Sequence, residues 1–134
     1  MVVAVVGKNA ELNLMTACAA LPTRAVHIGA SEFYVKKNAK LTFAMVHYWG
    51  PTHHVRLCIT AIVEEGELFV NYYIHIVPVK TLQMLPTAVL KGANAQAYLT
   101  TLVGGKDTHI GVGRRIVFNK HSVDVRGGYE ISSS

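Results

Sequence analysis

The stretch Val55–Val77, VRLCITAIVEEGELFVNYYIHIV, decides the fold prediction. Apolar residues occupy alternate positions on both sides of Glu65-Gly66, which is typical of two half-buried β-strands. A tight turn at Glu65-Gly66 predicts an antiparallel β-hairpin. Its register predicts that Ile59, Val70 and Tyr72 are buried together. The full core face is then Val55, Leu57, Ile59, Ala61 and Val63 with Leu68, Val70, Tyr72, Ile74 and Ile76.

The opposite face of this hairpin is predicted to be polar and basic. In the same register, Arg56 and Cys58 lie across from His75 and Tyr73. Ile62 and Phe69 would also be exposed there, and exposed apolar patches are typical of surfaces covered by a partner. We therefore expect a homo-oligomer.

Helix signals flank the hairpin. Asn9 and Asn94 are typical N-cap residues, and they predict helices over 10–21 and 94–103. Short helical turns are expected around Pro86. Strands are predicted at Val2–Val6, Ala25–Gly29, Glu32–Lys36, Leu41–Tyr48, Thr108–Phe118 and Ser122–Val125. No internal repeat is expected. The predicted class is α+β, a mainly antiparallel β-sheet with two or three short helices in a single domain (1–134), with residues 131–134 as a frayed tail.

Composition predicts a chain that buries a core without disulfides. The 134 residues are 51% hydrophobic and 16% charged. Cys18 and Cys58 lie in apolar patterns without C-x-x-C spacing, so both are expected to be small buried residues. The start of the chain lacks the order of a signal peptide, and no apolar run reaches the ~20 residues of a membrane span. We expect an intracellular protein, soluble or peripheral to a membrane, without a transmembrane segment.

The charge balance favours an anionic partner. Thirteen Lys and Arg oppose eight acidic residues, and the isoelectric point is near 9.4. Such a surplus attracts phosphate-rich partners, so RNA or an anionic lipid surface is expected. The same surplus is also an ordinary solubility charge for a small domain. The predicted anion-binding residues are Arg56, Tyr73, His75, Lys106, Arg115 and Lys120.

Metal, cofactor and catalytic patterns are weak. No nucleotide-binding glycine motif is present, and His54, Cys58 and His75 are spread along the predicted hairpin rather than converging. No metal site, cofactor or catalytic residue is therefore predicted. The alternative is a small enzyme in which Cys58 is a nucleophile beside His75 and Tyr73.

The size, the basicity and two short stretches, Leu68–Tyr73 and Ile110–Gly113, resemble small matrix proteins of negative-strand RNA viruses. The resemblance implies a structural protein that self-associates on an anionic surface, and it assigns no role to any residue. The predicted function is a non-enzymatic binding or assembly module. The enzyme built on the Cys58 face stays the alternative.

Overall fold

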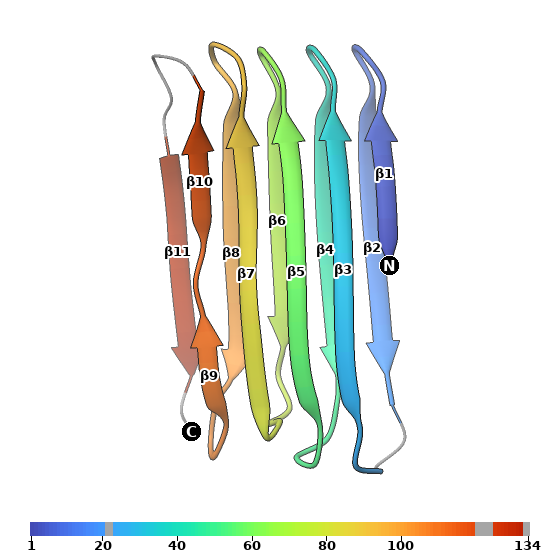
Figure 1. Cartoon of the computed structure of the whole chain (residues 1–134), viewed down its shortest axis with the longest axis vertical. Helices are drawn as coiled ribbons and strands as arrows, with labels where there is room; N and C mark the ends of the chain where they lie inside the picture. Colours follow the sequence, from blue (N-terminus) through green and yellow to red (C-terminus); the bar gives the residue numbers. More distant parts are fainter. Residues whose placement is uncertain (21–22, 120–124, 133–134) are drawn as a thin grey trace.

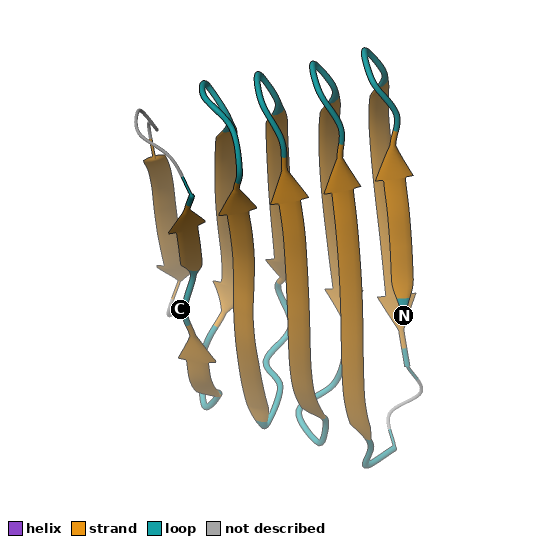
Figure 2. Ribbon diagram, turned by 45° about the horizontal axis from the view of Figure 1, so that its top comes forward, coloured by secondary structure: helices purple, strands orange, loops and turns teal. Residues whose placement is uncertain are grey.

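The computed structural model describes residues 1–20, 23–119 and 125–132, and it contains no helix among them. These residues form strands in two facing sheets (Figures 1 and 2). The predicted α+β class is therefore wrong, and the fold is all-β. The strands are β1 (Val2–Val6), β2 (Glu11–Ala19), β3 (Val26–Val35), β4 (Lys40–Tyr48), β5 (His54–Val63), β6 (Leu68–His75), β7 (Thr81–Leu90), β8 (Gln96–Gly104), β9 (His109–Val112), β10 (Arg115–Phe118) and β11 (Val125–Ser132).

Consecutive strands from β1 to β8 lie in opposite sheets, so the chain winds as a β-solenoid. Sheet A has the order β1-β3-β5-β7-β10, with β9 also pairing with β7, and sheet B has the order β11-β8-β6-β4-β2. Each paired strand runs parallel to its neighbour. The predicted antiparallel sheet is wrong because strands adjacent in sequence do not pair with each other. Residues 131–132, predicted to be frayed, end β11, and residues 133–134 lie outside the described residues.

One coil of the solenoid consists of a strand from each sheet with its two connections. The pairing shows its length: in sheet A, Val26 pairs with His54 and His54 pairs with Thr81. In sheet B, Glu11 pairs with Lys40 and Lys40 pairs with Leu68, at almost the same spacing. The chain therefore carries a structural repeat, contrary to the expectation of none. Stacked repeats of this kind bury a continuous core between neighbours.

The turn from sheet A to sheet B recurs from coil to coil. Asn and Gly enter the left-handed region at the lowest cost, and they supply its central residue. These residues are Asn9 (φ 60°), Asn38 (φ 58°), Gly66 (φ 71°) and Asn94 (φ 59°). Neighbouring turns are joined by backbone hydrogen bonds: the Gly66 N–H donates to the Ala93 carbonyl at 3.0 Å. One recurring turn therefore replaces three separate predictions, the N-caps at Asn9 and Asn94 and the hairpin turn at Gly66.

The core lies between the sheets, where alternate residues of each strand point inward. Their side chains form ladders across successive coils. Phe33 from sheet A packs on Phe43 and Phe69 from sheet B, with ring centroids 4.7 and 5.7 Å apart. All three rings are almost completely buried. Each such side chain contributes about 1.5–3 kcal/mol of hydrophobic stabilisation.

The predicted buried face is correct for the first strand of the hairpin and wrong for the second. The inward residues of β5 are those expected, and Ile59 is 1% exposed. In β6 the faces are exchanged: Phe69 and Tyr73 are buried, Val70 faces outward, and Tyr72 is 42% exposed. The predicted burial of Ile59 with Val70 and Tyr72 is therefore wrong for β6. The reason is that residues 64–67 cross from one sheet to the other instead of closing a hairpin.

Both predicted helices are strands. β2 replaces the helix over 10–21, and β8 replaces the helix over 94–103. Exposure in β2 alternates with a period of two, which is the side-chain period of a strand. The expected helical turns around Pro86 are the continuous strand β7.

Pro86, which has no backbone N–H, fits inside β7 because no strand pairs with β7 at that position on the side of β9 and β10. β9 pairs with Thr81–Met84 and β10 with Thr87–Leu90, so neither strand pairs with positions 85–86 on that side. The Gly113 N–H donates to the Met84 carbonyl at 2.9 Å, which places that edge toward β9 and β10. Backbone groups of alternate residues point to the same side, so Pro86 has the same orientation as Met84.

The repeated turn predicts unequal costs for two glycine substitutions. Gly66→Ala should lower the free energy of unfolding by about 1–2 kcal/mol, because φ is +71° and the new Cβ would lie 2.9 Å from the Asn38 side-chain oxygen. Gly7→Ala is the matched control, since no atom lies within 4 Å of the position that its Cβ would take. Urea unfolding measures both. Equal destabilisation by the two variants would contradict the left-handed turn.

Candidate functional site

Six ring-bearing side chains gather inside the solenoid at the end where the strands of sheet B finish. We call them the histidine cluster. They come from β3, β4, β6 and the loop that follows β4: His27, His47, Trp49, His53, Tyr73 and His75. All except His27 are buried, and His53, Tyr73 and His75 are 0% exposed.

His47 is the centre of the histidine cluster. Its ring centroid lies 5.3 Å from those of His27 and Tyr73, and 5.6 Å from that of Trp49. All three contacts are edge-to-face, which is a favourable aromatic geometry. The His75 ring lies 6.4 Å away on the same sheet. The imidazole of His47 is therefore enclosed by rings rather than by water.

The hydrogen bonds fix the protonation of His75. Its Nδ1 lies 3.0 Å from the His47 carbonyl oxygen. A carbonyl only accepts, so Nδ1 carries the proton and Nε2 keeps a lone pair. The Tyr73 hydroxyl lies 3.3 Å from His47 Nδ1. Among the described residues, the Nε2 atoms of His47, His53 and His75 are buried without a hydrogen-bond partner.

Burial keeps the imidazoles of His47 and His75 neutral at pH 7. It lowers the pKa of His47 to about 4, and repulsion from His27 and His75 acts in the same direction. Burial also lowers the pKa of His75, while its bond to the His47 carbonyl opposes the shift. The pKa of Tyr73 is raised, first by burial and then by nearby Cys18. Neutral imidazole is the form that binds metals.

A thiol stands in the same ladder as two of these histidines. Cys18 on β2 pairs in register with His47 on β4, and His47 pairs with His75 on β6. Because β2 is the outer strand of sheet B, Cys18 packs on the core but is only partly buried. The Cys18–His47–His75 ladder thus runs from the first coil into the interior. No three His, Cys, Asp or Glu side chains converge as a metal site in the ranges that the structure describes.

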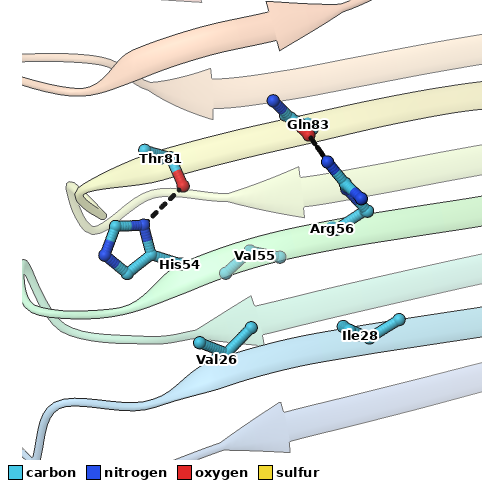
Figure 3. Close-up of a pocket in the computed structure, with 7 residues that line it drawn as sticks. All are labelled: Val26, Ile28, His54, Val55, Arg56, Thr81 and Gln83. Atoms are coloured by element: carbon cyan, nitrogen blue, oxygen red, sulfur yellow. Dashed lines mark hydrogen bonds between the residues drawn. The ribbon is translucent and has the colours of Figure 1, made fainter.

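Arg56, a predicted anion-binding residue, lies on the outer face of sheet A. It lines a shallow pocket between β3, β5 and β7 (Figure 3). Its Nε and Nη2 donate to Gln83 Oε1 at 2.9 and 2.7 Å, and His54 Nδ1 lies 3.0 Å from Thr81 Oγ1. The pocket is polar where these side chains of β5 and β7 line it, and it is apolar at β3, where Val26 and Ile28 line it.

The structure separates the other predicted site residues. Tyr73 and His75 are inside the solenoid, so they do not share the surface of Arg56. Cys58 is exposed on the outer face, contrary to the prediction of burial. The alternative enzyme site of Cys58 with Tyr73 and His75 is therefore not assembled.

The remaining predicted site residues lie in the C-terminal third. Lys106 is exposed in the turn after β8, and Arg115 is exposed at the start of β10. Lys120 lies outside the described residues. Anion binding by Arg56, Lys106 and Arg115 stays a prediction.

Sequence reasoning missed His47 as the centre of the site, although a signal was present. The spacing from Cys18 to His47 equals the spacing between the turn residues Asn9 and Asn38. The spacing from His47 to His75 likewise equals that from Asn38 to Gly66. A shared spacing of this kind places residues side by side in a solenoid.

Comparison with known proteins gives a consistent set of relatives. A protein of Methanothermobacter thermautotrophicus strain Delta H, named iron-sulfur cluster assembly SufBD family protein, is 38% identical over 113 residues, covering 82% of this chain. A protein of the same name from Archaeoglobus fulgidus is 40% identical over 111 residues, also covering 82%. The chain is similar to SufBD-family proteins. It spans 28% and 30% of the lengths of these two relatives.

A homologue from strain Winter of Methanothermobacter thermautotrophicus is likewise 38% identical over 113 residues. No family model matches the chain, and no solved structure matches it significantly. The names of the relatives overturn the prediction of a viral matrix-like, RNA-binding or membrane-associated structural protein. Within the described ranges, no helix has the length and apolar character needed to cross a bilayer.

The histidine cluster predicts acid sensitivity. As pH falls below about 6.5, the unfolded state takes up protons that folded His47, with a pKa near 4, does not. The free energy of unfolding should therefore fall between about pH 6.5 and 4, with His47 contributing about 3 kcal/mol. His47→Phe should flatten this slope in urea unfolding, whereas His109→Phe, at an exposed position, should leave it unchanged. An unaltered slope in His47→Phe would contradict the assignment.

A second buried titratable group lies in the repeated turn. Glu67 is 1% exposed and accepts a hydrogen bond from the Glu64 backbone N–H. Burial raises the pKa of Glu67 to about 7; nearby Glu64 adds to the rise, and the Glu64 N–H and Lys36 oppose it. The folded state is therefore more stable when the Glu67 side chain is protonated.

Glu67 predicts the opposite pH dependence from His47. Its contribution to stability is present below about pH 4.5 and is lost as pH rises through about 7. Glu67→Gln should raise the free energy of unfolding at pH 8 by about 1–2 kcal/mol and change it little at pH 4. Glu65→Gln, exposed in the same turn, should shift it by less than about 0.5 kcal/mol. Destabilisation by Glu67→Gln at pH 8 would show that the fold favours the ionised carboxylate, which would contradict the raised pKa.

Proposed function

We propose that this chain acts in iron–sulfur cluster assembly as a solenoid segment of a SufBD-type scaffold. The observation that carries the proposal is the 38–40% identity over 111–113 residues to proteins named for that process. The aligned part covers 82% of the chain, which is most of the solenoid. Iron and sulfide, or a cluster made from them, are the proposed substrate.

The positions of the two cysteines limit how the chain could hold this substrate. Thiolates are the usual ligands of iron–sulfur clusters. Cys58 points outward from sheet A, whereas Cys18 packs against the core from sheet B. The two thiols therefore cannot bind the same cluster within one chain. A site in this chain has to combine one cysteine with other ligands.

Cys18 has suitable neighbours in the Cys18–His47–His75 ladder. His75 offers an unprotonated Nε2, and burial keeps both histidines neutral. Strands in a sheet are about 4.8 Å apart, whereas ligands of a tetrahedral metal are about 3.5 Å apart. Rotation of the side chains could bring adjacent members of the ladder together, Cys18 with His47 and His47 with His75, whereas Cys18 and His75 are two strands apart. Imidazole and thiolate both suit iron.

The test is anaerobic reconstitution of the purified chain with ferrous iron and sulfide, followed by desalting. The parent chain should retain iron, acid-labile sulfide and a sulfur-to-iron charge-transfer absorption. Cys18→Ser should lose most of the bound iron, because it removes the thiolate of the ladder. Cys58→Ser is the matched control and should retain it.

Two results would contradict the proposal. A parent chain that retains neither iron nor sulfide would remove the function from this segment. Equal iron content in Cys18→Ser and the parent, with loss in Cys58→Ser, would move the site from the interior to the outer face of sheet A.

A further inference from the structure

The shallow pocket on the outer face of sheet A has two unlike walls (Figure 3). β3 supplies an aliphatic wall, while β5 and β7 supply a polar wall. Two rows of register partners cross the pocket from β3 through β5 to β7: Val26, His54 and Thr81 in one row, and Ile28, Arg56 and Gln83 in the other. The pocket measures about 330 Å³, which is within the range of pockets that hold small ligands.

Gln83 holds the Arg56 guanidinium in place at the polar wall. Nε and Nη2 of Arg56 both donate to Gln83 Oε1, at 2.9 and 2.7 Å. A guanidinium carries five N–H donors, so three of them remain, including both on Nη1. The edge formed by Nη1 and Nη2 is therefore oriented and still able to donate to a ligand.

The charge of Arg56 is not neutralised by a carboxylate among the described residues. Gln83 is uncharged, and none of the lining residues that the structure describes is acidic. The ion pairs of the described residues lie beside the turns between the sheets and join Lys36 with Glu64, Lys37 with Glu65, and Lys40 with Glu11. The polar wall thus carries one full positive charge that an anionic ligand can compensate.

The aliphatic wall is open to solvent. Val26 is 68% exposed and Ile28 is 73% exposed. Covering such side chains with another apolar group removes them from water, which is favourable. Neighbouring strands lie about 4.8 Å apart, so an apolar group over Ile28 is about 5 Å from an anion bound to Arg56.

We propose that this pocket binds a small aliphatic carboxylate. The planar edge of a guanidinium matches the two oxygens of a carboxylate, which it binds bidentately. One negative charge balances the one full charge of the wall, whereas a dianion leaves a charge unpaired beside aliphatic side chains. The separation of about 5 Å between the two walls is spanned by a chain of three or four carbons. The site is outside the solenoid, so it is independent of iron binding at the histidine cluster.

An NMR titration of the whole chain tests the proposal, with 4-methylpentanoate as the probe and ¹³C-labelled valine and isoleucine methyl groups as reporters. The Val26 and Ile28 methyl signals should shift saturably. Acetate should bind at least about tenfold more weakly, because it lacks the aliphatic part. 4-Methylpentanamide should also bind at least about tenfold more weakly, because it has the same shape without the charge.

Three variants locate the binding on Arg56. Arg56→Gln removes the charge and should raise the Kd for 4-methylpentanoate at least about tenfold. Gln83→Glu places a carboxylate of the protein against the guanidinium and should raise the Kd by a similar factor. Arg115→Gln is the matched control, because Arg115 is exposed on the same sheet outside the pocket, in register with Thr87. It removes the same net charge and should change the Kd by less than about twofold.

Four results would overturn the proposal. One is the lack of a saturable shift at Val26 and Ile28. Another is equal affinity for the amide and the carboxylate, which would leave only an apolar contact. A third is equal weakening by Arg115→Gln and Arg56→Gln, which would reduce the effect to net charge. The fourth is tighter binding of inorganic phosphate than of 4-methylpentanoate, which would show a pocket that selects charge and not a carboxylate.

Discussion

The whole structure depends on the parallel, in-register stacking of successive coils. This stacking places each residue beside its counterpart in the next coil, for example Thr60 beside Thr87. It therefore converts sequence spacing into side-chain ladders. The ladders that contain Leu and Phe form the core, and the ladder that contains Cys18, His47 and His75 forms the candidate site. Fold and site are consequences of the same constraint.

Local patterns in the sequence identify strands better than their pairing. The alternation in Val55–Val63 predicts a strand and its buried face, and the structure has both. The predicted pairing of the two strands is wrong because a turn at Gly66 is compatible either with a hairpin or with a crossing from one sheet to the other. The repetition at Asn9, Asn38, Gly66 and Asn94 distinguishes the two, since a hairpin turn has no reason to recur at that spacing. Asn also serves as an N-cap, which explains the predicted helices.

The site is harder to predict because polar residues occupy inward positions. In β6, the outward set contains Val70 and Ile74, while the inward set contains Tyr73 and His75. The rule that hydrophobic residues face the core favours the wrong set. His47 and His75 can be buried because they are neutral in the fold. Burial in turn lowers their pKa values, so they take up a proton less readily. Only the position of the turn determines which set points inward, so the site cannot be predicted without the repeat.

Disulfide trapping tests the stacking most directly. In a chain with both native cysteines replaced by serine, Thr60→Cys with Thr87→Cys places two thiols on register partners of neighbouring parallel strands. Such partners are about 4.8 Å apart, within the Cα separation that a disulfide spans. The pair Thr60→Cys with Asn71→Cys joins residues that only an antiparallel hairpin would place opposite each other. The solenoid predicts rapid oxidation of the first pair and none of the second, and a bridge between positions 60 and 71 without one between 60 and 87 would contradict it.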